Sequence, residues 1–288
     1  MRTRLLLPLL IGIIARADDF SEELNRLSGP GSHSREAAAL FVEAELEVQR
    51  SNPDYYAAAA TFWWHMALAK EATDKLDAGG IPDGKGDPLI RQRAIDLAIE
   101  GHRRFPQRVD IALFLALLEI RTDRPDNAVA TVRTLLDQAK STPDNLTWKD
   151  NARLPSAPDT FIPDQLTLHT FLLITTRAPR APDLARELAS ATIAVYPDHP
   201  RAYSALAEIA NLQGDREAAF HWLKLGHTKA PSDRYLLDCL IESAHRIRRF
   251  GDLPQLYRDL LATDIDEETR KNANKSLDQV NSRLAKGK

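Results

Sequence analysis

Histidines, acids, a lone cysteine and adjacent tryptophans are the residues of this chain best suited to chemistry, but their spacing matches no catalytic motif. The 288 residues include 8 histidines and 1 cysteine. A serine nucleophile elbow, a phosphate-binding glycine loop, a dinucleotide glycine fingerprint and a His-Glu-x-x-His helix are all missing from the sequence. His221 and His227 are six residues apart, which places them on different faces of a helix. We therefore predict no catalytic residue, no metal site and no cofactor.

Residues 77–87 are acidic and rich in glycine, and their carboxylates are the kind of ligand that calcium prefers. The order of an EF-hand loop is nevertheless wrong. Lys85 stands where a ligand is wanted, and no glutamate closes the site. We expect an ordinary inserted loop.

Aromatic residues are concentrated at 54–66, where Trp63 and Trp64 are adjacent. Neighbouring side chains on a helix point about 100° apart, so both indoles cannot face one core stripe. We expect one to pack in the core and the other to form an aromatic surface that stacks on a sugar or anchors a peptide. The alternative is that residues 18–51 cover both.

Residues 1–17 have the layout of a secretory signal peptide. Arg2 and Arg4 precede an uncharged apolar stretch at 5–14, and an Ala-Arg-Ala site follows. The stretch is too short to cross a bilayer core, which needs about 20 apolar residues. The alternative is a short buried helix. Cleavage after Ala17 would remove three arginines and no acid, which changes the formal net charge from −3 to −6.

The mature chain is expected to be periplasmic or secreted, without a stable membrane anchor. A bacterial lipoprotein needs a cysteine just after the apolar stretch, and the only cysteine is Cys239. No later run of about 18 apolar residues is present. The negative charge argues against a nucleic-acid partner.

From residue 35 onward, apolar residues recur three and four positions apart, which predicts an all-α chain. Pro, Gly, Asp and Asn separate the segments. We predict helices at 35–51, 54–76, 88–104, 107–121, 125–141, 163–176, 181–196, 200–213, 216–230, 233–249, 252–262 and 266–285, with insertions near 77–88 and 142–162.

The segment 200–231 has the clearest internal pattern. Two apolar helical stretches flank Gly214 and Asp215, since glycine can end one helix and aspartate can cap the next. Ala219 lies in the second stretch and follows Ala185 by an interval of about 34 residues. That interval is the period of the tetratricopeptide repeat (TPR), which this segment resembles.

Two positions depart from the usual TPR pattern. Ala207 stands in place of glycine and Gly226 in place of alanine, and both exchanges keep the side chains small. The resemblance implies a right-handed superhelical solenoid of about five TPR-like helix pairs. An irregular helical bundle is the alternative. The expected organisation is a signal peptide at 1–17, N-terminal helices and a link at 18–53, the solenoid at 54–262, and a polar capping helix with a tail at 263–288.

The resemblance also implies a peptide groove lined by the first helix of each pair. The positions carried over are Arg201, Ser204, Glu208, Asn211, Asp238, Ile241, His245 and Arg248. Their mixture of charges suits a peptide. Residues 102–104 and Arg108 form a basic cluster, which is either a solvated helix end or an anion-binding patch.

We predict a non-enzymatic protein–protein interaction scaffold of the cell envelope, whose protein or peptide partner is unknown. The alternative is a carbohydrate-binding or envelope-polysaccharide accessory protein that uses exposed aromatic residues to bind a glycan. A third hypothesis is an enzyme with a site between the two insertions, because long loops often carry function.

Overall fold

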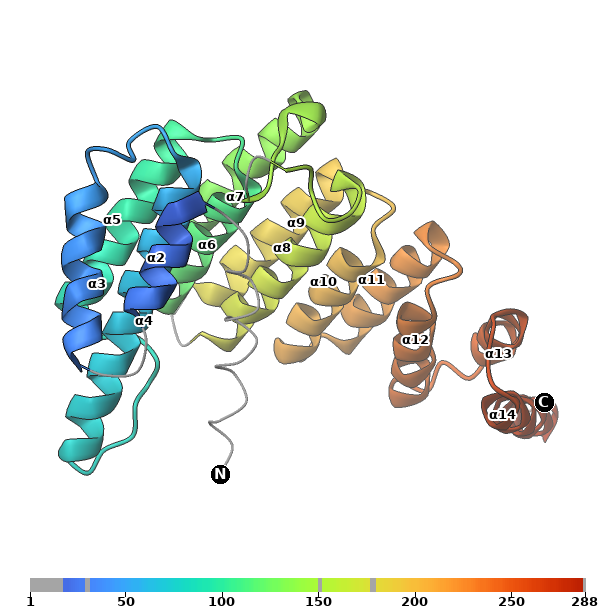
Figure 1. Cartoon of the computed structure of the whole chain (residues 1–288). Helices are drawn as coiled ribbons and strands as arrows, with labels where there is room; N and C mark the ends of the chain where they lie inside the picture. Colours follow the sequence, from blue (N-terminus) through green and yellow to red (C-terminus); the bar gives the residue numbers. More distant parts are fainter. Residues whose placement is uncertain (1–17, 29–31, 150–151, 177–179, 287–288) are drawn as a thin grey trace. The chain divides into compact units, whose positions relative to one another are not determined.

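The computed structural model describes residues 18–28, 32–149, 152–176 and 180–286 (Figure 1). The predicted signal peptide at 1–17 lies outside these residues. In the described ranges every regular element is a helix, and the only β contact is an isolated bridge between Arg108 and Thr147. The all-α prediction is confirmed. No described helix has the length and apolar character needed to cross a membrane.

The chain divides into two compact units, and the first is Met1–Pro155. Its helices are α2 (Asp18–Leu27), α3 (Ser32–Glu45), α4 (Pro53–Asp77), α5 (Pro88–Arg104), α6 (Val109–Arg121) and α7 (Pro125–Ser141), followed by the short 3-10 helix η1 (Pro143–Asn145). From α4 to α7 each helix packs against the next, and α4 also contacts α6.

The second unit is Ser156–Lys288. Its helices are α8 (Pro158–Thr175), α9 (Ala181–Val195), α10 (Pro200–Leu212), α11 (Arg216–Lys229), α12 (Arg234–Arg246), α13 (Leu253–Ala262) and α14 (Glu267–Lys286). Each packs against the next, and α10 also contacts both α8 and α12. Alternate helices α8, α10 and α12 are therefore neighbours.

Most helix bounds agree with the predicted ones within a few residues, but two differ. Helix α3 ends at Glu45, and turns occupy 46–51. Helix α8 begins at Pro158 and continues through Pro163, so the second insertion is shorter than 142–162. Burial of apolar residues on both sides of Pro163 explains why the helix extends past a proline that removes one backbone donor.

The turn between α10 and α11 forms as predicted. Gly214 has φ +80°, a left-handed conformation that glycine adopts without steric cost. The Asp215 carboxylate accepts a hydrogen bond from the Ala218 N–H at 2.9 Å, which caps α11. Asp233 caps α12 in the same way through the Leu236 N–H, at 2.8 Å.

Both units contain the same glycine-mediated approach of neighbouring helices. A Cβ atom added to Gly101 in α5 would lie 2.7 Å from the Cβ of Tyr56 in α4, and one added to Gly226 in α11 would lie 2.7 Å from the Cβ of Tyr203 in α10. Each glycine also lies close to an apolar side chain of the following helix. Since real atoms do not approach so closely, only glycine fits at these two positions without a shift of the helices.

A fully buried arginine joins three segments of the first unit. The guanidinium of Arg108 donates to both carboxylate oxygens of Asp110, at 2.9 and 2.8 Å, and to Asp54 at 2.5 Å. These bonds hold the start of α6 against the start of α4. The next residue, Val109, donates its N–H to the Thr147 carbonyl at 3.0 Å, which fixes part of the second insertion. The interpretation of Arg108 as part of a surface anion patch is therefore wrong.

The first insertion is held by a buried carboxylate of α4. Glu71 accepts hydrogen bonds from the backbone N–H groups of Asp83 at 2.8 Å, Gly84 at 3.3 Å and Gly86 at 2.8 Å. The Asp87 N–H also donates to a carbonyl of α4, at 2.9 Å. The loop is thus folded back along the helix that precedes it.

Candidate functional site

The strongest candidate for a binding surface is a face formed by α10 and α12 in the second unit. The Arg201 guanidinium lies over the ring of Tyr235 with its central carbon 4.5 Å from the ring centroid. Tyr235 is 46% exposed, so one side of this cation–π pair is open to solvent. We call the surface made by Arg201, Glu208, Asn211, Tyr235, Asp238 and Glu242 the α10–α12 face.

The α10–α12 face carries both charges and an aromatic ring. Asp238 forms an ion pair with Arg234 at 3.5 Å, and Glu242 forms one with Arg246 at 2.5 Å. Glu208 is exposed and close enough to act electrostatically on Tyr235. An exposed aromatic residue surrounded by paired charges can anchor an apolar side chain while its surroundings bind polar backbone groups.

Cys239 lies beside Tyr235 on the same helix and is half-buried. Burial raises the pKa of its thiol, with a smaller opposing effect from its hydrogen bond with Tyr235. Burial also raises the pKa of the Tyr235 hydroxyl. Both groups are therefore neutral near pH 7, and the thiol lacks the lowered pKa of an activated nucleophile.

On α10, the structure separates the four predicted lining residues. Glu208 is exposed, and Arg201 and Asn211 are half-buried. Ser204 is buried, and its hydroxyl donates to the Arg201 carbonyl at 2.7 Å. The prediction of Ser204 as a lining residue is wrong, because its side chain turns back onto its own helix.

On α12, the predicted register is displaced by three residues. The predicted α12 residues are placed on the assumption that Gly251-Asp252 repeats Gly214-Asp215. This second Gly-Asp pair comes three positions later than one TPR period would place it. In the structure, Tyr235 follows Arg201 by one such period, about 34 residues, and lies beside it. The extra residues lie in the turn between α12 and α13, which spans 247–252, whereas 213–215 separate α10 from α11. The α12 part of the face is therefore Tyr235, Asp238 and Glu242.

This displacement corrects two of the predicted lining residues, Ile241 and Arg248. Ile241 is buried in the core of the second unit. His245 is exposed on α12, and its imidazole Nε2 lies 2.9 Å from the hydroxyl oxygen of Tyr257 in α13. Arg248 follows the end of α12 and has φ +62° in the turn. Of the predicted α12 residues, Asp238 and His245 are exposed on the helix, and Asp238 is included in the α10–α12 face.

The aromatic surface predicted at Trp63 and Trp64 is also corrected. Trp64 is 5% exposed and packs in a core that includes Phe20 and Val42, as the covered alternative requires. Trp63 is half-buried, and its indole Nε1 is enclosed without a hydrogen-bond partner in the described part of the chain. Trp64 therefore does not form a stacking surface for a sugar, and Trp63 is only partly open to solvent.

The acids of the first insertion have structural partners. Lys75 forms an ion pair with Asp83 at 2.9 Å, and this contact lowers the pKa of Asp83 to about 2. Asp87 caps α5 by accepting from two backbone N–H groups at 3.1 Å. Within the described ranges, no group of three or more His, Cys, Asp or Glu residues is arranged to hold a metal ion.

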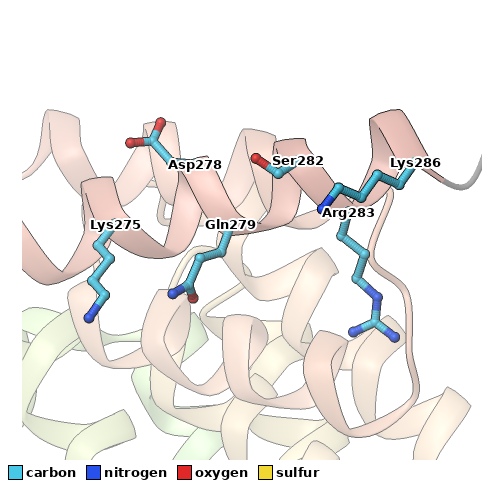
Figure 2. A pocket seen from close by; sticks show the side chains of 6 residues that line it. All are labelled: Lys275, Asp278, Gln279, Ser282, Arg283 and Lys286. Carbon is cyan, nitrogen blue, oxygen red and sulfur yellow. The ribbon is translucent and has the colours of Figure 1, made fainter.

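A second surface feature was missed in the sequence. One side of α14 carries a hollow of about 690 Å³ lined by Lys275, Asp278, Gln279, Ser282, Arg283 and Lys286, which we call the α14 hollow. In Figure 2, the side chains of Lys275, Gln279 and Arg283 extend from the same side of the helix. Their spacing of four residues, which is readable from the sequence, is the pattern that could have identified this face.

No family model matches the chain, and no curated protein matches it significantly.

Proposed function

We propose that this chain is a TPR-like helical-repeat protein that binds a peptide or an extended segment of another protein on its α10–α12 face, without catalysing a reaction. The observation that carries this proposal is the pair of Arg201 and Tyr235. They are separated by one TPR period, lie side by side on alternate helices and remain partly open to solvent.

The repeat interpretation is supported by spacing that recurs in both units. Gly101 and Gly226 each come seven residues after a buried alanine and each contact a tyrosine of the preceding helix. One TPR period also relates buried Tyr203 to buried Leu237. On this proposal, α10 and α12 are the first helices of consecutive repeats, and their shared side is the peptide groove.

The proposed compartment is the cell envelope or the exterior, on the basis of the signal-peptide pattern at 1–17. A partner in that compartment would reach the α10–α12 face as an extended segment. The exposed tyrosine ring would hold an apolar side chain, and the surrounding carboxylates would select polar or basic neighbours.

A peptide library displayed on phage tests the proposal directly. Peptides selected on the full chain would be labelled, and their dissociation constants measured by fluorescence anisotropy. Tyr235→Ala is expected to weaken binding by roughly tenfold or more, because it removes an aromatic anchor. Leu89→Ala is the matched control, since Leu89 is also an exposed apolar residue, at 86%, but lies on α5.

Two results would contradict the proposal. The first is a selection that enriches no peptide with measurable affinity. The second is a set of enriched peptides whose affinity is unchanged in Tyr235→Ala while that variant retains the thermal stability of the wild type.

A further inference from the structure

The α14 hollow has an excess of basic residues. Residues 270–286 contain five basic residues and one acid, whereas the whole chain has a formal net charge of −3. Basic side chains elsewhere are often paired with acids, as Arg249 is with Glu217 at 2.8 Å. In the described part of the chain, Lys275, Arg283 and Lys286 have no acidic partner. The hollow therefore presents uncompensated positive charge.

One of these cations is held in place before any ligand arrives. The central carbon of the Arg283 guanidinium lies 3.9 Å from the ring centroid of Phe250, which belongs to the turn after α12. This stacking fixes the plane of the guanidinium and leaves its N–H edge available to a carboxylate. A pre-positioned arginine loses less conformational entropy when it binds.

The dimensions of the hollow suit an extended peptide. Lys275 and Lys286 are eleven residues apart, about 16 Å along a helix, which is the length of about five residues of extended chain. Gln279 and Ser282 lie between them and can exchange hydrogen bonds with a peptide backbone.

The composition of α14 argues against a membrane or a nucleic acid as the occupant. Its apolar residues Leu277, Val280 and Leu284 pack in the core of the second unit, so this helix has no large exposed apolar residue to insert into lipid. It also has no aromatic residue on which a base could stack.

We propose that the α14 hollow is a second interaction site, which binds an acidic, extended peptide segment through Lys275, Arg283 and Lys286. The carboxylates of the peptide pair with the three cations, and Arg283 makes the bidentate contact. This site is separate from the α10–α12 face and goes beyond the function proposed for that face.

Fluorescence anisotropy of labelled oligoglutamate with the full chain tests this inference, with oligoglutamine of the same length as the uncharged control. The triple variant Lys275→Gln, Arg283→Gln and Lys286→Gln is expected to weaken oligoglutamate binding roughly tenfold. The matched control changes three exposed basic residues of other helices to glutamine, namely Arg121, Lys140 and Arg216, with little expected loss. Tyr235→Ala is expected to leave this binding unchanged, which separates the two proposed sites.

A second variant tests the same site without depending on the folding of the triple variant. Asp278→Asn removes the one acid that lines the hollow and should tighten oligoglutamate binding about twofold. The proposal is overturned if oligoglutamine binds equally well, if the two triple variants lose the same affinity, or if Asp278→Asn has no effect. Tighter binding of anionic lipid vesicles or of a single-stranded oligonucleotide would also overturn it, because the class of partner would then be wrong.

Discussion

At the residue scale, Glu119 of α6 makes the stability of this protein depend on pH. Its side chain is buried, with a hydrogen bond from the Thr131 hydroxyl at 3.0 Å. Burial raises its pKa from 4.5 to about 7. The folded state therefore binds a proton between about pH 4.5 and 7 that the unfolded state releases, so the free energy of unfolding decreases as pH rises through this range.

The substitution Glu119→Gln tests this pH dependence. Glutamine can still accept the Thr131 hydrogen bond and has no charge to desolvate. The free energy of unfolding of the variant should therefore exceed that of the wild type by roughly 3 kcal/mol at pH 8. Near pH 4 the two should be almost equally stable. Urea unfolding at both pH values measures the difference, with the exposed Glu36→Gln as the control. An equal effect at pH 4 and pH 8 would contradict the titration of Glu119.

The buried Arg108 gives a second prediction at this scale. Arg108→Ala leaves Asp54 and Asp110 without their shared cation inside the protein, and removing one partner of a buried ion pair typically costs about 3–5 kcal/mol. We expect a loss of this size in denaturant unfolding monitored by circular dichroism. Arg121→Ala removes an exposed arginine from the end of α6 and should cost less than about 1 kcal/mol. Similar losses in both variants would contradict the structural role of Arg108.

Arg108 and Trp64 show what the sequence could not determine at the residue scale. Arg108 follows a run of basic residues at the end of α5, and local spacing alone suggests a solvated cluster. Its burial depends on Asp54, which is 54 residues away in the sequence. Trp64 and Trp63 are adjacent, and only their packing against α2 and α3 decides which is buried. Both outcomes depend on long-range contacts.

At the element scale, local patterns predicted helix positions well because each helix has its own periodicity and its own end residues. The start of α11 was predictable from Asp215 and Gly214, whose conformations are local properties. The register of α12 was not, because Gly251-Asp252 defines the start of α13 and the turn before it contains three extra residues. The packing of Tyr235 on Arg201 identifies the register, and it is a contact between helices.

At Gly226, close packing and helix propensity predict opposite effects of an alanine substitution on stability. Alanine is usual at the corresponding position of the proposed TPR-like repeat and would favour the helix by about 1 kcal/mol. Its Cβ would nevertheless lie 2.7 Å from the Cβ of Tyr203, and such overpacking typically costs about 1–3 kcal/mol. We therefore expect Gly226→Ala to lower the melting temperature, and Gly101→Ala to do the same. Gly251→Ala is the control, since no atom lies within 4 Å of its added Cβ.

Calorimetry of the three glycine variants separates packing from propensity. If propensity dominated, Gly101→Ala and Gly226→Ala would both melt at a higher temperature than the wild type. A gain in stability at either position would show that the neighbouring helices move apart easily. It would also weaken the interpretation of the two glycines as equivalent repeat positions.

At the scale of the whole molecule, the predicted cleavage after Ala17 separates residues 1–17 from all the described helices. Every described helix begins at Asp18 or later, so removal of 1–17 takes away none of them. Helix α2 contributes Phe20 and Leu24 to the core of the first unit, and these residues remain after cleavage at Ala17. The proposed cleavage site is therefore compatible with the packing of α2, the first of the described helices.

Export in a bacterial host gives the last prediction. The wild-type chain should be recovered from the periplasm or the medium with Asp18 as its first residue, as measured by intact mass and N-terminal sequencing. Cleavage needs small side chains at Ala15 and Ala17, so Ala17→Asp should block processing and retain the first 17 residues. Arg16→Gln should still be processed, because the residue between the two alanines is not restricted. Recovery of the wild type from the cytoplasm with Met1 intact would show instead that this apolar stretch belongs to the mature protein.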